Sequence, residues 1–157
     1  MKMFFEILLL IIAIIFLSYL SFYFARIVVS PSLQENSLGS VCMKEACFQV
    51  ETAKTEAQRE KGLMYKNILE KDRGMLFIFD KEGIYPFWMK NTLIPLDIIW
   101  IDGNNKVVFV NQNTQPCKSL ICSSIIPSAK ARYVLEINAG LYEEFGVKLG
   151  DELKISY

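Results

Sequence analysis

The chain begins with a long apolar segment and continues, after a polar stretch, as short apolar runs separated by turn residues. No residue from Ile7 to Ala25 is charged. An α-helix rises about 1.5 Å per residue, so this run is just long enough to cross a hydrocarbon core of roughly 30 Å. We therefore expect residues 1–29 to form a transmembrane signal-anchor that contacts a membrane through residues 4–28.

A cleaved signal peptide is the alternative for this segment. The apolar core of a signal peptide usually has about 7–15 residues, fewer than this run, and the bulky stretch from Ser21 to Ala25 offers no small-residue cleavage site. Pro31 then favours the end of the helix, and Ser, Gln, Asn and Gly are frequent over residues 30–40, which predicts a linker. A single globular domain is expected over residues 41–157.

The rest of the chain predicts mostly β-structure. Alternating or continuous apolar runs between turn residues indicate strands at residues 48–53, 75–79, 97–101, 106–110, 133–138 and 153–157. Thr55 and Gln58 have the spacing of a capping box for a short helix that ends at Gly62, and Asn138 could cap a second helix over residues 139–145. We expect a mostly β (α+β) domain, a compact antiparallel barrel or sandwich of about six strands with two short helices.

Charge and composition exclude several classes of function. The chain has 17 Lys and Arg against 17 Asp and Glu, with no basic run, so we expect no nucleic-acid partner. It contains no histidine, which excludes Ser-His-Asp and Cys-His catalysis and a His-ligated zinc or haem within the chain. We predict no cofactor and no metal site, and any acid–base chemistry must use Asp, Glu, Lys, Tyr or Cys.

The four cysteines form two equally spaced pairs, Cys42 with Cys47 and Cys117 with Cys122. Disulfides, either local or crossing, are the favoured interpretation and would place the domain on the extracytoplasmic side of the membrane. A zinc site of four thiolates and free, partly buried thiols are the alternatives, although structural zinc usually uses a two-residue gap. A redox role is least supported, because the spacing is not that of a Cys-x-x-Cys motif.

The most unusual stretch is residues 87–92, where polar side chains alternate with very apolar ones. A lysine among apolar groups needs a partner or loses its charge, and Asp97, the nearest acid across a bend at Pro95, could pair with Lys90. In one interpretation this is a structural network in which Trp88 fills the core. In the other, Trp88 is the wall of a ligand pocket and Lys90 is an anion anchor or a reactive amine.

Other candidate ligand-binding residues surround this stretch. Asn91 and Thr92 could bond back to the loop backbone. Arg59, near Met64, either belongs to a solvated helix face or lines the mouth of the same pocket. Glu136 lies among apolar residues of a predicted strand, where it either faces solvent or points inward as a partner for one of the basic side chains.

These stretches also resemble a known family. The chain is similar to the family called domain of unknown function 192, and the similarity extends over about residues 48–157. It is carried by Arg59, Gly62-Leu63-Met64, Gly74-Met75-Leu76-Phe77, Phe87-Trp88-Met89-Lys90-Asn91-Thr92, Ile94-Pro95-Leu96-Asp97, Tyr133-Val134-Leu135-Glu136, Gly140 and Gly150-Asp151. The resemblance implies a compact, barrel-like β fold and no established activity. Lys61 stands where the family has an alanine, and the cysteine pairs look like a subgroup feature.

The sequence supports two hypotheses about function. The favoured hypothesis is a membrane-anchored extracytoplasmic module that binds a small ligand or a protein. The alternative is an enzyme that uses Lys90 and Asp97 on a small anionic or carbonyl substrate. Neither the ligand nor the oligomeric state can be derived from the residues.

Overall fold

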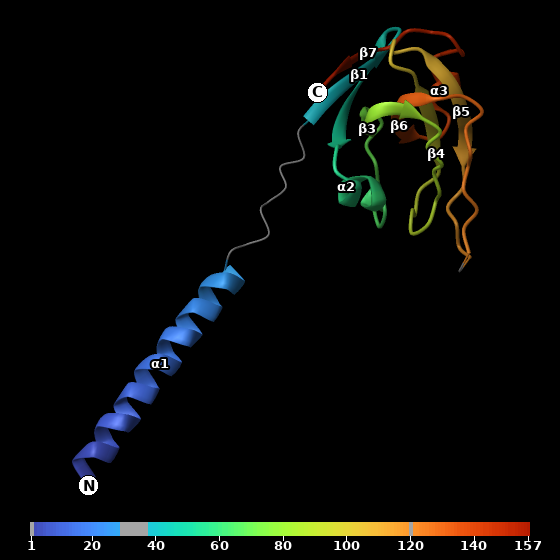
Figure 1. Cartoon of the computed structure of the whole chain (residues 1–157). Helices are drawn as coiled ribbons and strands as arrows, with labels where there is room; N and C mark the ends of the chain where they lie inside the picture. Colours follow the sequence, from blue (N-terminus) through green and yellow to red (C-terminus); the bar gives the residue numbers. More distant parts are fainter. Residues whose placement is uncertain (1, 29–37, 120) are drawn as a thin grey trace. The chain divides into compact units, whose positions relative to one another are not determined.

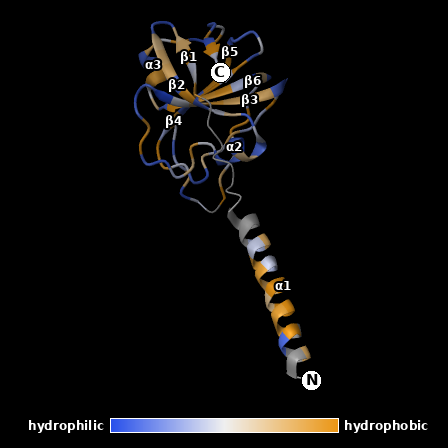
Figure 2. Ribbon diagram, turned by 90° about the vertical axis from the view of Figure 1, so that its left-hand side faces the viewer, coloured by the Kyte–Doolittle hydropathy of each residue, from blue (hydrophilic) through white to orange (hydrophobic). Residues whose placement is uncertain are grey.

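The computed structural model describes residues 2–28, 38–119 and 121–157, and the chain divides into two compact units, residues 1–35 and 36–157. The first unit contains helix α1 (Lys2–Val28), whose described side chains are mostly apolar and exposed. Figure 2 shows the hydrophobic colouring along most of this helix. Among the residues that the structure describes, no helix has the length and hydropathy that a membrane crossing requires.

The second unit is built on one seven-stranded sheet with two short helices (Figure 1). Its strands are β1 (Leu38–Met43), β2 (Ala46–Ala53), β3 (Arg73–Gly83), β4 (Leu96–Ile101), β5 (Val107–Thr114), β6 (Ala131–Asn138) and β7 (Lys154–Ser156), and its helices are α2 (Glu56–Lys61) and α3 (Leu141–Glu144). The strand order is β5-β4-β6-β3-β2-β1-β7. The sheet is mixed, because β2 and β3 run parallel while the other pairs are antiparallel.

The expected mostly β fold is therefore confirmed, but the expected antiparallel barrel or sandwich of about six strands is wrong in two respects. The segment with α2 connects β2 to β3 and returns the chain to the starting end of β2, so this pair is parallel. The sheet is also open, although Lys106 and Glu152 form an isolated bridge close to its two edge strands. The strand missed from the sequence is β1, which begins inside the predicted linker at Leu38; residues 30–37 of that linker lie outside the described residues.

Both faces of the sheet are covered by apolar side chains. One face carries a core that includes Phe48, Val50, Leu76, Ile99, Leu135, Ile137 and Leu141, and the other carries Leu63, Met75, Phe77, Met89, Ile98, Trp100 and Val134. A strand buried on both faces needs no polar alternation. This explains why β4 and β6 are almost entirely buried and read as continuous apolar runs, interrupted by Asp97 and Glu136.

Of the two predicted helix caps, the one at α2 forms and the one at Asn138 does not. Helix α2 has the predicted capping box: Gln58 N donates to Thr55 Oγ1 at 3.3 Å, and Thr55 N donates to Gln58 Oε1 at 2.9 Å. The second predicted helix is shorter than expected, and its N-cap is Gly140. Asn138 instead belongs to β6, and its side chain donates to the Leu69 carbonyl at 2.9 Å.

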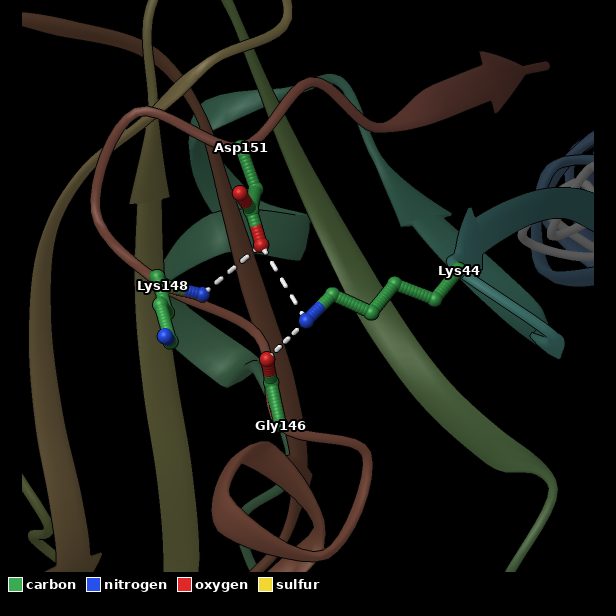
Figure 3. A network of polar contacts seen from close by, with 4 residues as sticks. All are labelled: Lys44, Gly146, Lys148 and Asp151. Atoms are coloured by element: carbon green, nitrogen blue, oxygen red, sulfur yellow. Dashed lines mark hydrogen bonds and ion pairs between the residues drawn. The ribbon is translucent and has the colours of Figure 1, made fainter.

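The cysteines form two local disulfides, Cys42–Cys47 and Cys117–Cys122, as the favoured interpretation predicted. The first joins residues directly opposite each other in the β1–β2 hairpin. At the tip of that hairpin the Lys44 ammonium donates to the Gly146 carbonyl and lies 3.6 Å from the Asp151 carboxylate (Figure 3). The hairpin tip is thus tied to the loop between α3 and β7.

Candidate functional site

A groove lies between helix α2 and residues 85–92, which include segment 87–92 singled out from the sequence. Three adjoining hollows form it, and all three are lined by Glu60 and Trp88. Phe87 fixes one wall, because its backbone exchanges hydrogen bonds of 3.0 and 2.7 Å with Ile125. We call this depression, lined by residues 56–64 and 85–92 together with buried sheet residues, the α2 groove.

The innermost hollow of the α2 groove reaches the sheet. It has a volume of about 30 Å³ and its lining includes Arg59, Met64, Trp88, Thr92 and Glu136. Glu136 is 5% exposed and Thr92 is 6% exposed. No hydrogen bond joins the carboxyl of Glu136 or the hydroxyl of Thr92 to another described residue. Neither group is fully sealed from solvent; among the described residues, the sealed side-chain atom without a partner is Arg132 Nε. Two buried polar side chains with free hydrogen-bonding capacity therefore line the same small space.

The position of Glu136 follows from the sheet register. It lies in β6 between Met75 of β3 and Ile98 of β4, on the face whose core contains Val134 and Trp100. Of the two directions considered for Glu136, the solvent-facing one is wrong, because β6 is an inner strand with both faces covered. Burial disfavours the charged carboxylate and raises the pKa of Glu136 to about 8.

Arg59 is held at the rim of this hollow, between α2 and the sheet. Its Nη1 donates to the carbonyls of Lys54 at 2.5 Å and Ile78 at 3.0 Å, and its guanidinium lies 5.0 Å from the centre of the Phe79 ring. Phe79 in turn stacks on Tyr85, with ring centres 3.5 Å apart. The guanidinium is therefore positioned by backbone and aromatic contacts, and its remaining N–H groups are not used by any hydrogen bond among the described residues.

Trp88 and Lys90 lie at the outer part of the groove. Trp88 is 43% exposed, so the interpretation in which it fills the core is wrong; the core position belongs to Trp100. The Lys90 ammonium lies 5.1 Å from the centre of the Trp88 ring and is exposed. A lysine in this position keeps its hydration and makes a cation–π contact, so it needs no buried partner.

The expected pair of Lys90 with Asp97 is also wrong. Asp97 is fully buried and lies opposite Ile137 in the β4–β6 register, which places it on the other face of the sheet from Glu136. Its two oxygens accept hydrogen bonds from Asn113 N at 2.8 Å and from Tyr142 N, at the start of α3, at 2.9 Å. Asp97 is therefore a structural residue that joins β4 to β5 and α3.

The loop of the motif is held by a combination of backbone and side-chain contacts. Asn91 adopts a left-handed backbone with φ of 57°, its carbonyl accepts from Tyr65 N at 2.9 Å, and its amide lies 3.8 Å from the Met64 sulfur. Thr92 N donates back to the Met89 carbonyl at 3.2 Å. These contacts turn the chain so that Thr92 enters the innermost hollow while Lys90 stays outside.

The structure adds groove residues that the sequence did not identify as a site. Tyr85 and Pro86 line a mostly apolar hollow of about 260 Å³ beside Phe79. Glu60 of α2 borders all three hollows. The residues from Gly83 to Lys90 form no regular strand, so no periodicity could have indicated which of them face α2.

Another hollow, of about 370 Å³, lies beside the β1–β2 hairpin tip. Its charged groups are already used: Lys44 contacts Asp151 and Gly146, and the Asp151 carboxylate also accepts from Lys148 N at 2.9 Å (Figure 3). Within the described ranges, no group of three or more Cys, Asp or Glu side chains is arranged to hold a metal ion. The α2 groove is therefore the better candidate for a ligand site.

The fold and the groove define a small, mostly β domain with a ligand-sized depression beside its helix α2. Residues 40–155 match a family model, DUF192, which is described as an uncharacterised conserved family. The chain belongs to this family of uncharacterised proteins, so the resemblance derived from the motif residues is confirmed.

Individual relatives agree with this assignment. The UPF0127 protein PH1112 of Pyrococcus horikoshii is 33% identical over 112 residues, which cover 68% of this chain and 86% of that protein. A solved structure of a protein of unknown function from Novosphingobium aromaticivorans is 33% identical with a TM-score of 0.67, covering 74% of this chain and 83% of that one. A second, from Sinorhizobium meliloti and described as a candidate transcription regulator, is 34% identical with a TM-score of 0.67, covering 75% and 92%.

Proposed function

We propose that the domain is a binding module for a small amphipathic ligand, which it holds in the α2 groove. The observation that carries the proposal is the pair of buried side chains, Glu136 and Thr92, that line one hollow without a hydrogen-bond partner among the described residues. Both groups are nearly buried but not sealed from solvent, so a bound molecule can replace water as their hydrogen-bond partner. A bound molecule that supplies those hydrogen bonds is therefore stabilised at this place.

The outer part of the groove suits the apolar part of such a ligand. Tyr85, Pro86 and Trp88 line its hollow of about 260 Å³, and Tyr85 is fixed by stacking on Phe79. Aromatic walls with a few convergent polar groups are typical of small-molecule sites. A ligand of this kind would place its apolar part against Trp88 and its polar group beside Glu136.

The alternative of an enzyme that combines Lys90 with Asp97 has no support from the geometry. The two side chains are not paired, and Asp97 is occupied by two backbone amides. A protein partner is less well supported than a small ligand, because the free polar groups of the groove lie in a hollow of about 30 Å³ that a protein surface could enter only through one side chain.

The ligand proposal predicts which signals respond to binding. In the nuclear magnetic resonance spectrum of a 15N-labelled protein, a panel of small amphipathic molecules should shift the indole N–H signal of Trp88. The indole of Trp100 should respond little, because it is buried and donates to the Tyr85 carbonyl at 2.9 Å. Trp88→Ala has lost the indole signal, so its affinity is measured by isothermal titration calorimetry alongside the wild type. It should bind about tenfold more weakly, the typical contribution of one aromatic contact.

Leu149→Ala is the matched control, since Leu149 is also exposed and belongs to none of the three hollows of the α2 groove. It should leave the affinity unchanged. A panel in which no molecule shifts the Trp88 signal, or in which every affinity is the same in Trp88→Ala, would contradict the proposal.

We further propose that the N-terminal segment attaches the domain to a membrane and displays it on the extracytoplasmic side. The support comes from the uncharged run from Ile7 to Ala25 and from the exposed apolar side chains of the described part of α1. The two disulfides favour an oxidising compartment, which fits an outward-facing domain.

Fractionation of cells that make the full-length chain tests this attachment. The protein should sediment with membranes and stay there after extraction with alkaline carbonate, while a variant that lacks residues 2–28 should not. A full-length chain in the soluble fraction would contradict membrane attachment. So would a mature N-terminus that begins after the apolar run.

A further inference from the structure

We infer that the innermost hollow of the α2 groove binds the carboxylate of a small organic acid, whose apolar body lies against Trp88 and Tyr85. The inference rests on the proposed ligand-binding function and adds the chemical class of the ligand. It follows from the hydrogen-bonding character, the charge and the size of the hollow.

The innermost hollow is surrounded by hydrogen-bond donors. The Thr92 hydroxyl can donate one hydrogen bond, and the Glu136 carboxyl donates one while it is protonated, the form that its burial favours. Arg59 uses Nη1 for two backbone carbonyls and has further N–H groups at the rim. A hollow surrounded by these donors is suited to a group that accepts several hydrogen bonds.

The side chains that line the innermost hollow carry a net positive charge while Glu136 is protonated. The charged side chains that line the innermost hollow come from α2 and are Arg59, Glu60 and Lys61. The other lining elements contribute only uncharged side chains besides Glu136, since the lining residues of β3 and of segment 87–92 are Phe77, Phe87, Trp88 and Thr92. With Glu136 protonated, positive charge is in excess, which favours an anion over an ammonium group.

The volumes of the two hollows match the two parts of such a ligand. A hollow of about 30 Å³ has room for roughly two groups as large as a water molecule. The two oxygens of a carboxylate are groups of this size. The adjoining hollow of about 260 Å³, lined by Phe79, Tyr85 and Pro86, accommodates an aromatic ring or a short aliphatic chain. The two hollows share Arg59, Glu60, Phe87 and Trp88 in their linings.

Three probes of similar size test the inference: benzoate, benzamide and benzylamine. Each is titrated into the full-length protein in uncharged detergent at pH 6.5, with the Trp88 indole signal as the readout. Benzoate should bind at least about tenfold more tightly than benzamide, and benzylamine should bind most weakly. Thr92→Val, which keeps the shape and removes the hydroxyl, should weaken benzoate binding by about fivefold to tenfold.

The pH dependence of benzoate binding distinguishes an effect of Glu136 ionisation from effects of pH on the rest of the protein. Between pH 6.5 and pH 9, benzoate binding to the wild type should fall by about tenfold, because the ionised carboxylate of Glu136 repels the ligand. Glu136→Gln keeps an N–H donor and no charge, so it should bind benzoate with little change over the same range.

Two results would overturn the inference. One is benzylamine as the tightest of the three probes, with an affinity that rises with pH; the ligand class would then be cationic, while the binding function of the groove would stand. The other is an equal affinity for benzoate and benzamide that Thr92→Val does not change. Failure of the binding function itself is distinguishable, because then no molecule of the wider panel would shift the Trp88 signal.

Discussion

Replacement of Asp97 by alanine is expected to lower the free energy of unfolding by about 3 kcal/mol or more. The fully buried carboxylate accepts from Asn113 N and Tyr142 N, and both amides lose this acceptor in Asp97→Ala. A hydrogen bond to a charged group contributes about 1.5–3 kcal/mol, and a buried amide without a partner adds a cost of its own. Urea-induced unfolding of the purified protein at pH 7 measures the loss.

Asp102→Ala provides a matched control for this prediction. The Asp102 carboxylate also accepts from two backbone amides, those of Asn104 and Lys106, each at 2.8 Å, but in a turn that water reaches. Water can replace the missing acceptor there, so the loss should be about 1 kcal/mol. Equal losses in the two variants, or a wild-type unfolding curve for Asp97→Ala, would show that Asp97 does not have the structural role assigned to it.

The substitution Glu136→Gln should stabilise the protein at alkaline pH and leave its stability nearly unchanged at pH 4. The pKa of Glu136 rises from an ordinary value of 4.5 to about 8 in the folded state. Between these two values the unfolded chain has lost the proton that the folded protein still holds, so the free energy of unfolding falls as pH rises. Below pH 4.5 both states are protonated, and above about pH 8 both are ionised and the loss is complete.

The size of the effect follows from the same shift. One pKa unit corresponds to about 1.4 kcal/mol, so the full loss is on the order of 5 kcal/mol. Glutamine has no charge at any pH, and the stability gained by Glu136→Gln should therefore grow from pH 4.5 to about pH 8 and then become constant.

Asp80→Asn, at an exposed position, is the control for general effects of charge. Unfolding curves of the three proteins between pH 4 and pH 9 test the prediction. A difference between Glu136→Gln and wild type that does not depend on pH would contradict it.

Signals confined to a few neighbouring residues predicted the structure well. The capping box at Thr55 and Gln58 formed as expected, because both partners lie within one helical turn. The apolar runs of β3, β4 and β6 were identified because buried strands need no polar residues on either face. Cysteine spacing predicted the disulfides, but not their local connectivity, because spacing alone does not exclude crossed bridges.

Features that depend on contacts distant in the sequence could not be predicted. Strand order was one of them: the parallel pairing of β2 with β3 depends on how the α2 segment packs, and the order of elements alone favours hairpins. The role of Asp97 was another, since its partners Asn113 and Tyr142 lie 16 and 45 residues further along the chain.

The candidate site was identified only in part. Sequence reasoning singled out segment 87–92 and associated Arg59, Met64 and Glu136 with it, and the structure places Arg59, Met64, Trp88, Thr92 and Glu136 around one hollow. It assigned the central chemistry to Lys90 and Asp97, because a lysine and an acid close together in sequence resemble a pair. The inward direction of Glu136 is set by the pairing of β6 between β3 and β4, which no local pattern encodes.

The proposed ligand site depends most on the carboxyl of Glu136 being buried, unpartnered among the described residues and protonated at neutral pH. A pH titration of the side-chain carboxyl carbons in a protein with 13C-labelled glutamate measures this directly, and Glu136→Gln identifies the signal by its absence. We expect the Glu136 signal to titrate with a midpoint near pH 8, well separated from the other glutamates. A midpoint near 4.5 would mean that the carboxyl is hydrated or paired, and it would contradict both the binding site and the ligand class derived from it.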